Sequence, residues 1–231
     1  MNVPVVENVL KLNDQIAAVN RQKLHEAGVM TLDLIGGPGC GKTTLLEATL
    51  RELADHVNLG VLVGDLATSR DGNRMKQWSD QVVQINTGRG CHLDANQVQQ
   101  GMEHLDLEAL DILIIENVGN MICPVGFDLG QDLKIAMFSV TDGDDKPAKH
   151  PPLTCTADAI ILNKCDLTPH VNFEFENFLT DVRAANHEAP ILRVSASQGD
   201  VEAWTNWLTS HWEHFQVNTL GRKSDHVVLE A

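Results

Sequence analysis

Short and nearly continuous apolar runs recur along the chain, separated by mixed stretches in which polar residues dominate. Six of these runs consist mainly of Val, Ile, Leu and Ala; they lie at residues 59–63, 82–85, 112–115, 135–140, 159–162 and 191–194. Strands that are buried on both faces of a parallel sheet show this pattern. A further apolar strand is predicted to begin at Leu32. The chain is therefore expected to contain a sheet that is covered on both sides.

Segments of helical periodicity lie between the apolar runs, at residues 42–54, 94–104, 171–185 and 201–215. Regular alternation of strand and helix predicts an α/β fold with a mostly parallel sheet and helices on both of its faces. The last helix has apolar and aromatic residues at spacings of three and four, which is typical of a stripe that faces the core: Val201, Trp204, Leu208, Trp212 and Phe215.

Apolar residues at positions 5, 9, 12, 16 and 19 predict an amphipathic helix from residue 5 to about residue 27. Its apolar stripe has two candidate partners, the body of the domain or a second subunit, and the sequence leaves both open. Residues from 216 onward are mainly polar. We therefore divide the chain into an N-terminal helix at 1–28, an α/β domain at 29–216 and a loosely held C-terminal tail at 217–231.

The composition restricts the classes of partner. The 231 residues include 17 Lys and Arg against 32 Asp and Glu, so the formal charge is -15 and most of the surface repels nucleic acids and anionic membranes. No apolar run has the length of a membrane-spanning helix, and the N-terminus lacks the features of a secretory signal peptide, so we expect a cytoplasmic protein. Five cysteines, an odd number, do not suggest a disulfide framework in that compartment.

The predicted strand at Leu32 runs directly into a glycine-rich loop and a helix, in the sequence LDLIGGPGCGKTTLL. The loop matches G-x-x-x-x-G-K-[ST], the phosphate-binding loop of nucleotide-hydrolysing proteins. Glycines let backbone N–H groups approach phosphate oxygens, Lys42 would contact the β and γ phosphates, and the Thr43 hydroxyl would bind Mg²⁺. The residues predicted to contact nucleotide here are Gly36, Gly37, Gly39, Cys40, Gly41, Lys42, Thr43 and Thr44.

A second motif of the form N-K-x-D follows the apolar run at 159–162 and consists of Asn163, Lys164, Cys165 and Asp166. The Asp166 carboxylate can accept two hydrogen bonds from the N1–H and N2–H₂ edge of guanine, a pattern that adenine lacks, so the predicted nucleotide is GTP. Asn163 would hold the loop, and the stem of Lys164 would lie along the base. After the next strand, a backbone N–H of Ser195 or Ala196 could contact the guanine carbonyl oxygen.

Acidic residues at two other strand ends would face the same phosphates. Glu116 ends the run at 112–115, where such proteins keep a carboxylate for Mg²⁺, and Gly119 is free to turn its N–H towards the γ-phosphate. Asp65 and Asp71 follow the run at 59–63 and are candidates to bind Mg²⁺ or the attacking water; helix capping and solvation at the surface are the alternative. The predicted catalytic residues are Lys42, Asp65, Asp71 and Glu116, and the predicted Mg²⁺ ligands are Thr43, Asp65 and Glu116.

Cys91 and His92 lie in a glycine-broken loop, and Cys123 lies four residues after Gly119. Two thiolates and an imidazole suit Zn²⁺ or Ni²⁺, although a cysteine taken alone is more often a small buried hydrophobic residue. Three ligands do not complete a tetrahedral structural site. Water or a second subunit would supply the rest, so a metal that bridges a homodimer is one interpretation.

These motifs together resemble the hydrogenase maturation GTPases of the HypB type, nickel-insertion factors of the SIMIBI class that are related to the urease accessory GTPases. The matching segments span nearly the whole chain and are LNDQIAAVNR, GGPGCGKTTLLEATL, GD-x-x-T-x-x-D from residue 64, QINTGRGCHLDA, IIENVGNMICPVGFDLG, SVTDGDDKP, LNKCDL and VSAS. The resemblance implies a GTPase that binds Ni²⁺ or Zn²⁺ through Cys91, His92 and Cys123. It also implies a GTP-dependent homodimer, a small zinc-containing nickel chaperone as partner, and the large subunit of a [NiFe]-hydrogenase as client.

Several alternatives remain open at this level. The chain has no cysteine before Cys40 and only His25 before that position, so tight nickel storage by an N-terminal motif is not expected. Three competing functions are a paralogue that serves another metalloenzyme such as urease, a P-loop kinase of small molecules, and a metal carrier in which the nucleotide is merely structural. With neither an arginine finger nor a positioned glutamine in view, intrinsic hydrolysis is predicted to be slow.

Overall fold

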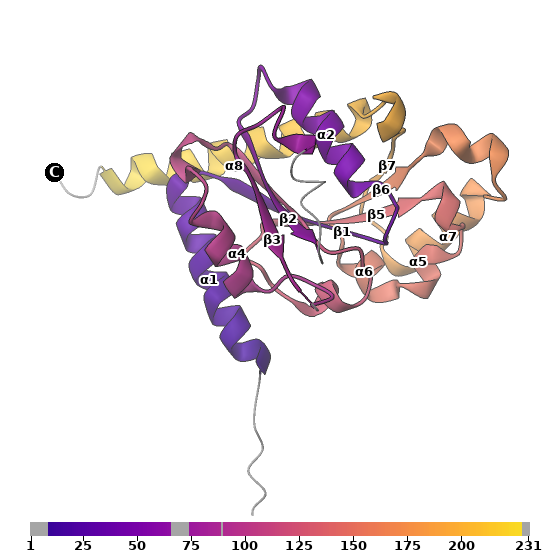
Figure 1. Ribbon diagram of the computed structural model, residues 1–231, viewed down its shortest axis with the longest axis horizontal. Helices are drawn as coiled ribbons and strands as arrows, with labels where there is room; N and C mark the ends of the chain where they lie inside the picture. Colours follow the sequence, from indigo (N-terminus) through magenta and orange to yellow (C-terminus); the bar gives the residue numbers. More distant parts are fainter. Residues whose placement is uncertain (1–8, 66–73, 89, 228–231) are drawn as a thin grey trace, which may run out of the picture.

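Seven parallel strands form the centre of the computed structural model, which describes residues 9–65, 74–88 and 90–227 (Figure 1). The strands are β1 (Met30–Gly36), β2 (Leu59–Asp65), β3 (Val82–Asn86), β4 (Ile112–Glu116), β5 (Leu133–Ser139), β6 (Ala159–Asn163) and β7 (Ile191–Arg193), in the order β3-β2-β4-β1-β5-β6-β7. Every pairing between neighbours is parallel, so the α/β fold predicted from the apolar runs is confirmed.

β1 lies at the middle of the sheet and determines where the functional residues gather. All seven of its residues are buried, and it pairs with β4 on one side and β5 on the other. The carboxyl ends of parallel strands lie at one edge of a sheet, and loops at that edge bind ligands in open α/β folds. The glycine-rich loop after β1, Asp65, Glu116 and Asn163 all stand at this edge.

Helices cover both faces of the sheet, as Figure 1 shows. They are α1 (Val9–Ala27), α2 (Lys42–Leu53), α4 (Ala95–Met102), α5 (Lys146–Lys149), α6 (Pro151–Thr156), α7 (Phe175–Ala185) and α8 (Glu202–Val227). One apolar cluster joins the sheet to α2 and α8. Two further clusters join the opposite face to α6 and α7 at one end and to α1 and α4 at the other. None of the described helices is long and apolar enough to cross a membrane.

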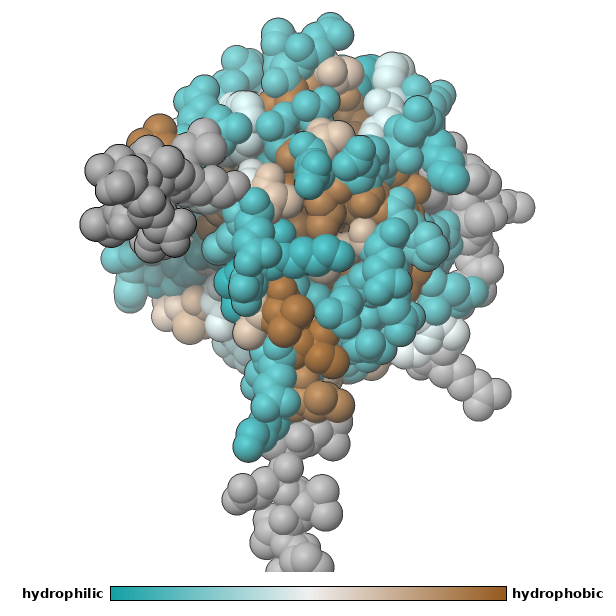
Figure 2. Space-filling view, turned by 90° about the vertical axis from the view of Figure 1, so that its left-hand side faces the viewer, coloured by the Kyte–Doolittle hydropathy of each residue, from teal (hydrophilic) through white to brown (hydrophobic). Residues whose placement is uncertain are grey.

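α1 packs on the body of the domain, but not through the apolar stripe that the sequence predicts. Leu12 is 63% exposed and Val19 is 53% exposed, whereas Asn13 and Asn20 are buried. The Asn20 Nδ2 donates hydrogen bonds to the carbonyl oxygens of Ala95 (2.8 Å) and Leu129 (3.1 Å). Because amide groups satisfy these backbone partners, they turn the apolar stripe away from the contact face. Figure 2 shows apolar atoms left exposed on the lower part of this side of the molecule.

α8 continues to Val227, so the segment predicted as a loose tail from residue 217 begins as helix. Trp204 lies near the start of α8, is fully buried, and donates a hydrogen bond from Nε1 to Thr49 Oγ1 (2.9 Å). Further along, the Phe215 ring lies 5.4 Å from the ring of His25 on α1. The helix therefore reaches from β7 to α1, and it continues past the predicted end at residue 215.

Candidate nucleotide and metal site

The loop after β1 has the conformation that a phosphate-binding loop requires. Gly39 and Gly41 have φ angles of 75° and 103°, in the left-handed region that glycine tolerates best. A Cβ atom at Gly41 would lie 2.4 Å from Asn163 Nδ2, so a larger residue would displace the N-K-x-D loop. α2 begins directly afterwards and points its N-terminus towards a cavity of about 490 Å³. A helix N-terminus with open backbone N–H groups suits an anion such as phosphate.

Three predicted catalytic side chains line this cavity. Lys42 is nearly buried, and its Nζ donates a hydrogen bond to the Gly36 carbonyl oxygen (3.2 Å). The Thr43 hydroxyl donates to Glu116 Oε1 (2.8 Å), which brings together two oxygen ligands from different elements. Asp65 lines the same cavity, and Asp71 lies outside the described residues. Hydroxyl and carboxylate oxygens are the ligands that Mg²⁺ prefers, so these residues fit a magnesium ion.

The N-K-x-D loop is locked to the phosphate loop by side chains. Asn163 Nδ2 donates to the Cys40 carbonyl oxygen (2.9 Å), and Asn163 Oδ1 accepts from the backbone N–H of Ala196 (3.1 Å). Lys164 adopts a positive φ of 60° and its Nζ donates to the Gly39 carbonyl oxygen (2.7 Å). The loop is therefore placed before any base is bound.

Asp166 has the environment expected of a base-selecting carboxylate. Its backbone N–H donates to Ser195 Oγ (3.1 Å), which joins the loop to the next strand end. Its Oδ1 is buried and has no hydrogen-bond partner among the described residues. A buried polar atom without a partner is costly, and a ligand that donates hydrogen bonds removes that cost. The donor edge of guanine fits this carboxylate.

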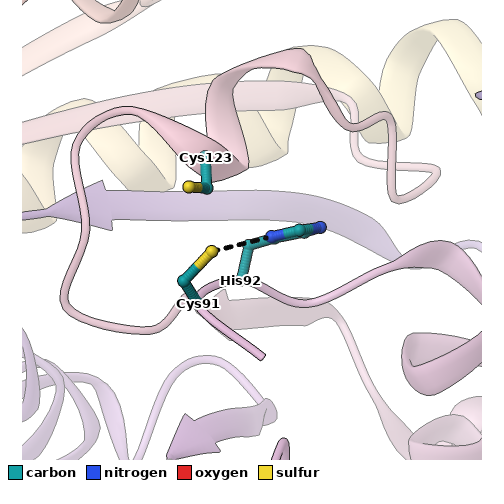
Figure 3. Close-up of side chains that lie close together, drawn as sticks. All are labelled: Cys91, His92 and Cys123. Carbon is teal, nitrogen blue, oxygen red and sulfur yellow. Dashed lines mark hydrogen bonds between the residues drawn. The ribbon is translucent and has the colours of Figure 1, made fainter. Parts of the chain in front are cut away.

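The loops after β3 and β4 bring three side chains together, as Figure 3 shows: Cys91 and His92 from the first loop and Cys123 from the second. One ligand atom from each residue lies within 4.8 Å of the other two. The Cys91 Sγ lies 3.5 Å from His92 Nδ1, and Cys91 is exposed to solvent. Among the described residues this is the one such cluster, and its soft donor set fits Ni²⁺ or Zn²⁺.

The two thiols influence each other's protonation. A hydrogen bond between them lowers the pKa of the Cys123 thiol and raises the pKa of the Cys91 thiol. Burial lowers the pKa of His92, which favours the neutral imidazole that binds metals. The His92 ring lies 3.9 Å from the Phe127 ring at an interplanar angle of 37°, so Phe127 fixes its orientation.

Four residues at the site were missed by the sequence analysis: Asp33, Asn117, Asn120 and Phe127. Asn117 Nδ2 donates to Asp33 Oδ1 (3.1 Å), and both side chains are fully buried. The sequence does offer a signal for Asp33, because an acidic residue stands within the apolar run MTLDLIG, and every residue of that strand is buried. The two asparagines lie on either side of Gly119 in the sequence ENVGN, and each has a partner in the distant loop that carries Cys91 and His92, which no local pattern indicates.

Asp33 gives stability a pH dependence with a defined sign. Burial raises its pKa from 3.8 to about 7, so the folded chain holds this proton more tightly than the unfolded chain. The stabilisation is complete below the unfolded pKa and is lost as the pH rises through about 7, a change of roughly 4 kcal/mol. Asp33→Asn keeps the acceptor for Asn117 and is expected to flatten this slope in urea unfolding between about pH 5 and 8. Asp106→Asn, at an exposed position, should leave the slope as in the wild type. A slope unchanged by Asp33→Asn would contradict this assignment.

Comparisons with known proteins place these features in a family. The family model described as "CobW/HypB/UreG, nucleotide-binding domain" matches residues 31–193. The hydrogenase maturation factor HypB of Rhizobium leguminosarum bv. viciae is 42% identical over 207 residues, which cover 89% of this chain and 69% of that protein.

Two solved structures share the fold and the sequence pattern. HypB from Archaeoglobus fulgidus has a TM-score of 0.82 and 35% identity, covering 88% of this chain and all of that chain. HypB from Helicobacter pylori, solved in complex with nickel, has a TM-score of 0.83 and 34% identity, covering 88% of this chain and 96% of that chain. The resemblance inferred from the motifs is confirmed.

Proposed function

The chain belongs to the CobW/HypB/UreG family of nucleotide-binding domains, and from this premise we propose that it is a GTP-hydrolysing metallochaperone for hydrogenase maturation. The observation that carries the proposal is the position of Cys123. It lies four residues after Gly119, which lines the nucleotide cavity, and it meets Cys91 and His92 from another loop. A nucleotide-sensing segment and a soft-metal cluster therefore share one stretch of backbone.

In this proposal the predicted catalytic residues and Mg²⁺ ligands act on the phosphates, the metal ion and the attacking water. Bound GTP would supply the phosphate bond that is cleaved. Mg²⁺ would neutralise the negative charge that develops on the phosphates during cleavage. Lys42 binds the terminal phosphates, and Thr43 with Glu116 holds the metal ion. Asp65 binds Mg²⁺ or the attacking water, and Asp71, which lies outside the described residues, is assigned the same role from the sequence alone. Because no glutamine is among the described residues that line the cavity, we expect slow intrinsic hydrolysis.

The cluster of Cys91, His92 and Cys123 takes up the nickel that the protein carries; zinc is the competing ion. Three ligands leave a coordination position open, and Cys91 is exposed, so we propose that a second copy of the chain completes the site in a homodimer. Free thiols in such a site need a reducing compartment, which favours the cytoplasm. A small zinc-containing chaperone would deliver nickel, and the large subunit of a [NiFe]-hydrogenase would receive it.

The competing functions are less well supported. A small-molecule kinase does not explain the buried, unpartnered Oδ1 of Asp166 or the thiol and imidazole cluster. A paralogue that serves urease would use the same two sites, so the identity of the client is decided by assay with each apoenzyme. A metal carrier with a structural nucleotide predicts equal nickel affinity in every nucleotide state.

Nickel titration in two nucleotide states tests the proposal. We expect nickel to bind at least about fivefold more tightly with a non-hydrolysable GTP analogue than with GDP, because the γ-phosphate orders the segment that carries Cys123. Isothermal titration with light scattering in parallel measures the affinity and the size of the oligomer. Equal affinity in both states, with no change in size, would contradict the proposal and favour a simple carrier.

A further inference from the structure

Two segments distant in the sequence meet at the metal-ligating cluster. The first is the metal loop, residues 90–93, which carries Cys91 and His92; the second is the switch segment, residues 117–123, which ends at Cys123. Neither segment is part of a helix or strand of the sheet until the last residue of the switch segment, so the two are not held together by a backbone ladder. Side-chain amides make the connections instead.

Asn117 is the inner connection. Its Oδ1 accepts hydrogen bonds from the backbone N–H groups of Leu93 and Val118, both at 3.1 Å. Its Nδ2 donates to Asp33 Oδ1, and this acceptor fixes which end of the amide faces the metal loop. A single buried side chain thus ties the end of β4 to the residue after His92.

Asn120 is the outer connection and is half-exposed. Its Nδ2 donates to the Cys91 carbonyl oxygen (3.2 Å). Its Oδ1 accepts from the backbone N–H of Ile122 (2.9 Å) and of Cys123 (3.4 Å). One amide therefore binds the backbone of both cysteines whose sulfur atoms face the common site.

The switch segment also lies directly against the phosphate loop. A Cβ atom at Gly119 would lie 2.9 Å from the Cα of Pro38. Met121 is buried, and its Cε lies 3.4 Å from the position of a Cβ on Gly37. A shift of the phosphate loop is transmitted to the switch segment because close-packed atoms cannot interpenetrate.

We propose that Asn120 is a positioning residue that makes Cys91 follow Cys123 when the nucleotide changes, so that the ligand cluster responds as one unit. The inference rests on the proposed function, since it concerns how the nucleotide state reaches the metal ligands. Without the donor group of Asn120, the switch segment still follows the phosphate loop, but of the two amide connections to the metal loop only that of Asn117 remains. The sulfur atoms are then brought together less closely in the GTP state, and the coupling between the sites weakens.

Asn120→Asp isolates this role. The carboxylate keeps the acceptor for the amides of Ile122 and Cys123 but has no hydrogen to donate to the Cys91 carbonyl oxygen. We expect the ratio of nickel affinities between the GTP-analogue and GDP states to fall at least about threefold towards one. The affinity for GTP measured in the absence of nickel should not change. Sulfur-to-nickel charge-transfer absorption, recorded in both states, should show a smaller difference between the states than in the wild type.

Two matched variants complete the experiment. Asn96→Asp adds the same charge at an exposed position near the start of α4 and should keep the wild-type ratio. Asn120→Ala, which lacks donor and acceptor, should lower the ratio at least as much as Asn120→Asp and serves if that variant is unstable.

The outcomes separate this inference from the proposed function. Equal nickel affinities in the two states of the wild type would overturn both proposals. A wild-type ratio above one that Asn120→Asp and Asn120→Ala leave unchanged would overturn the role of Asn120 alone. An equal loss of affinity in both states would also overturn it, because a merely structural role moves the affinity and not the ratio.

Discussion

Replacing Asp166 by Asn is expected to lower GTP affinity by about 100-fold or more and to create a preference for xanthosine triphosphate. Asn offers guanine one acceptor and a misplaced donor where Asp166 offers two acceptors, so one hydrogen bond is lost and two donor groups face each other. Xanthine carries a carbonyl oxygen where guanine carries its amino group, so the new amide can donate to it. Competition against a fluorescent guanosine nucleotide measures both affinities.

The control for this experiment is Asp55→Asn, which makes the same change at an exposed position after α2. It should bind GTP as the wild type does. If Asp166→Asn retained GTP affinity and gained none for xanthosine triphosphate, Asp166 would not read the base. If ATP displaced the labelled nucleotide from the wild type as well as GTP does, the result would favour a small-molecule kinase instead.

Replacing Cys123 by Ala is expected to weaken nickel binding at the cluster by at least about 100-fold and to remove the sulfur-to-nickel absorption bands. Loss of a side chain that hydrogen-bonds a metal ligand typically costs about 10-fold to 100-fold in metal affinity, and loss of the ligand itself costs more. The remaining pair, Cys91 and His92, offers one thiol and one imidazole with their donor atoms 3.5 Å apart. Equilibrium dialysis and ultraviolet absorption give the stoichiometry and the signature.

Cys155→Ala is the matched control, because Cys155 is an exposed free cysteine on α6 outside the cluster. It should bind nickel with wild-type stoichiometry. Wild-type binding by the Cys123→Ala variant would show that nickel is held elsewhere and would leave a guanine-nucleotide switch without the metal function. Nucleotide affinity should be unchanged in both variants, which confirms that each is folded.

Local sequence was sufficient for the nucleotide motifs because their geometry depends on residues that are adjacent in the chain. Glycine spacing allows the φ angles of Gly39 and Gly41, and a helix that starts at Lys42 completes the anion site. The apolar runs also predicted the parallel sheet from local sequence. A strand of a parallel sheet is buried on both faces, so its residues are apolar without alternation. The common edge for Glu116, Asn163 and the phosphate loop then follows from parallel strands alone.

Tertiary packing decided what no single segment contains. The sequence left the partner of the α1 stripe open, and the fold leaves Leu12 and Val19 exposed because the amides of Asn13 and Asn20 meet backbone groups of distant segments. The sequence ended α8 at residue 215, whereas the helix continues to Val227, and only the fold brings Phe215 against His25.

The sequence by itself determined the sheet, predicted GTP as the nucleotide, and singled out the three residues that meet as candidate metal ligands. Only the fold placed Cys91 beside Cys123 and tied both to Asn120, buried Asp33 against Asn117, and laid Phe127 on His92. The physical reason is the range of the interactions. Dihedral preference and periodicity act between neighbours in the chain, whereas desolvation and side-chain hydrogen bonding depend on which distant segments fill the same space.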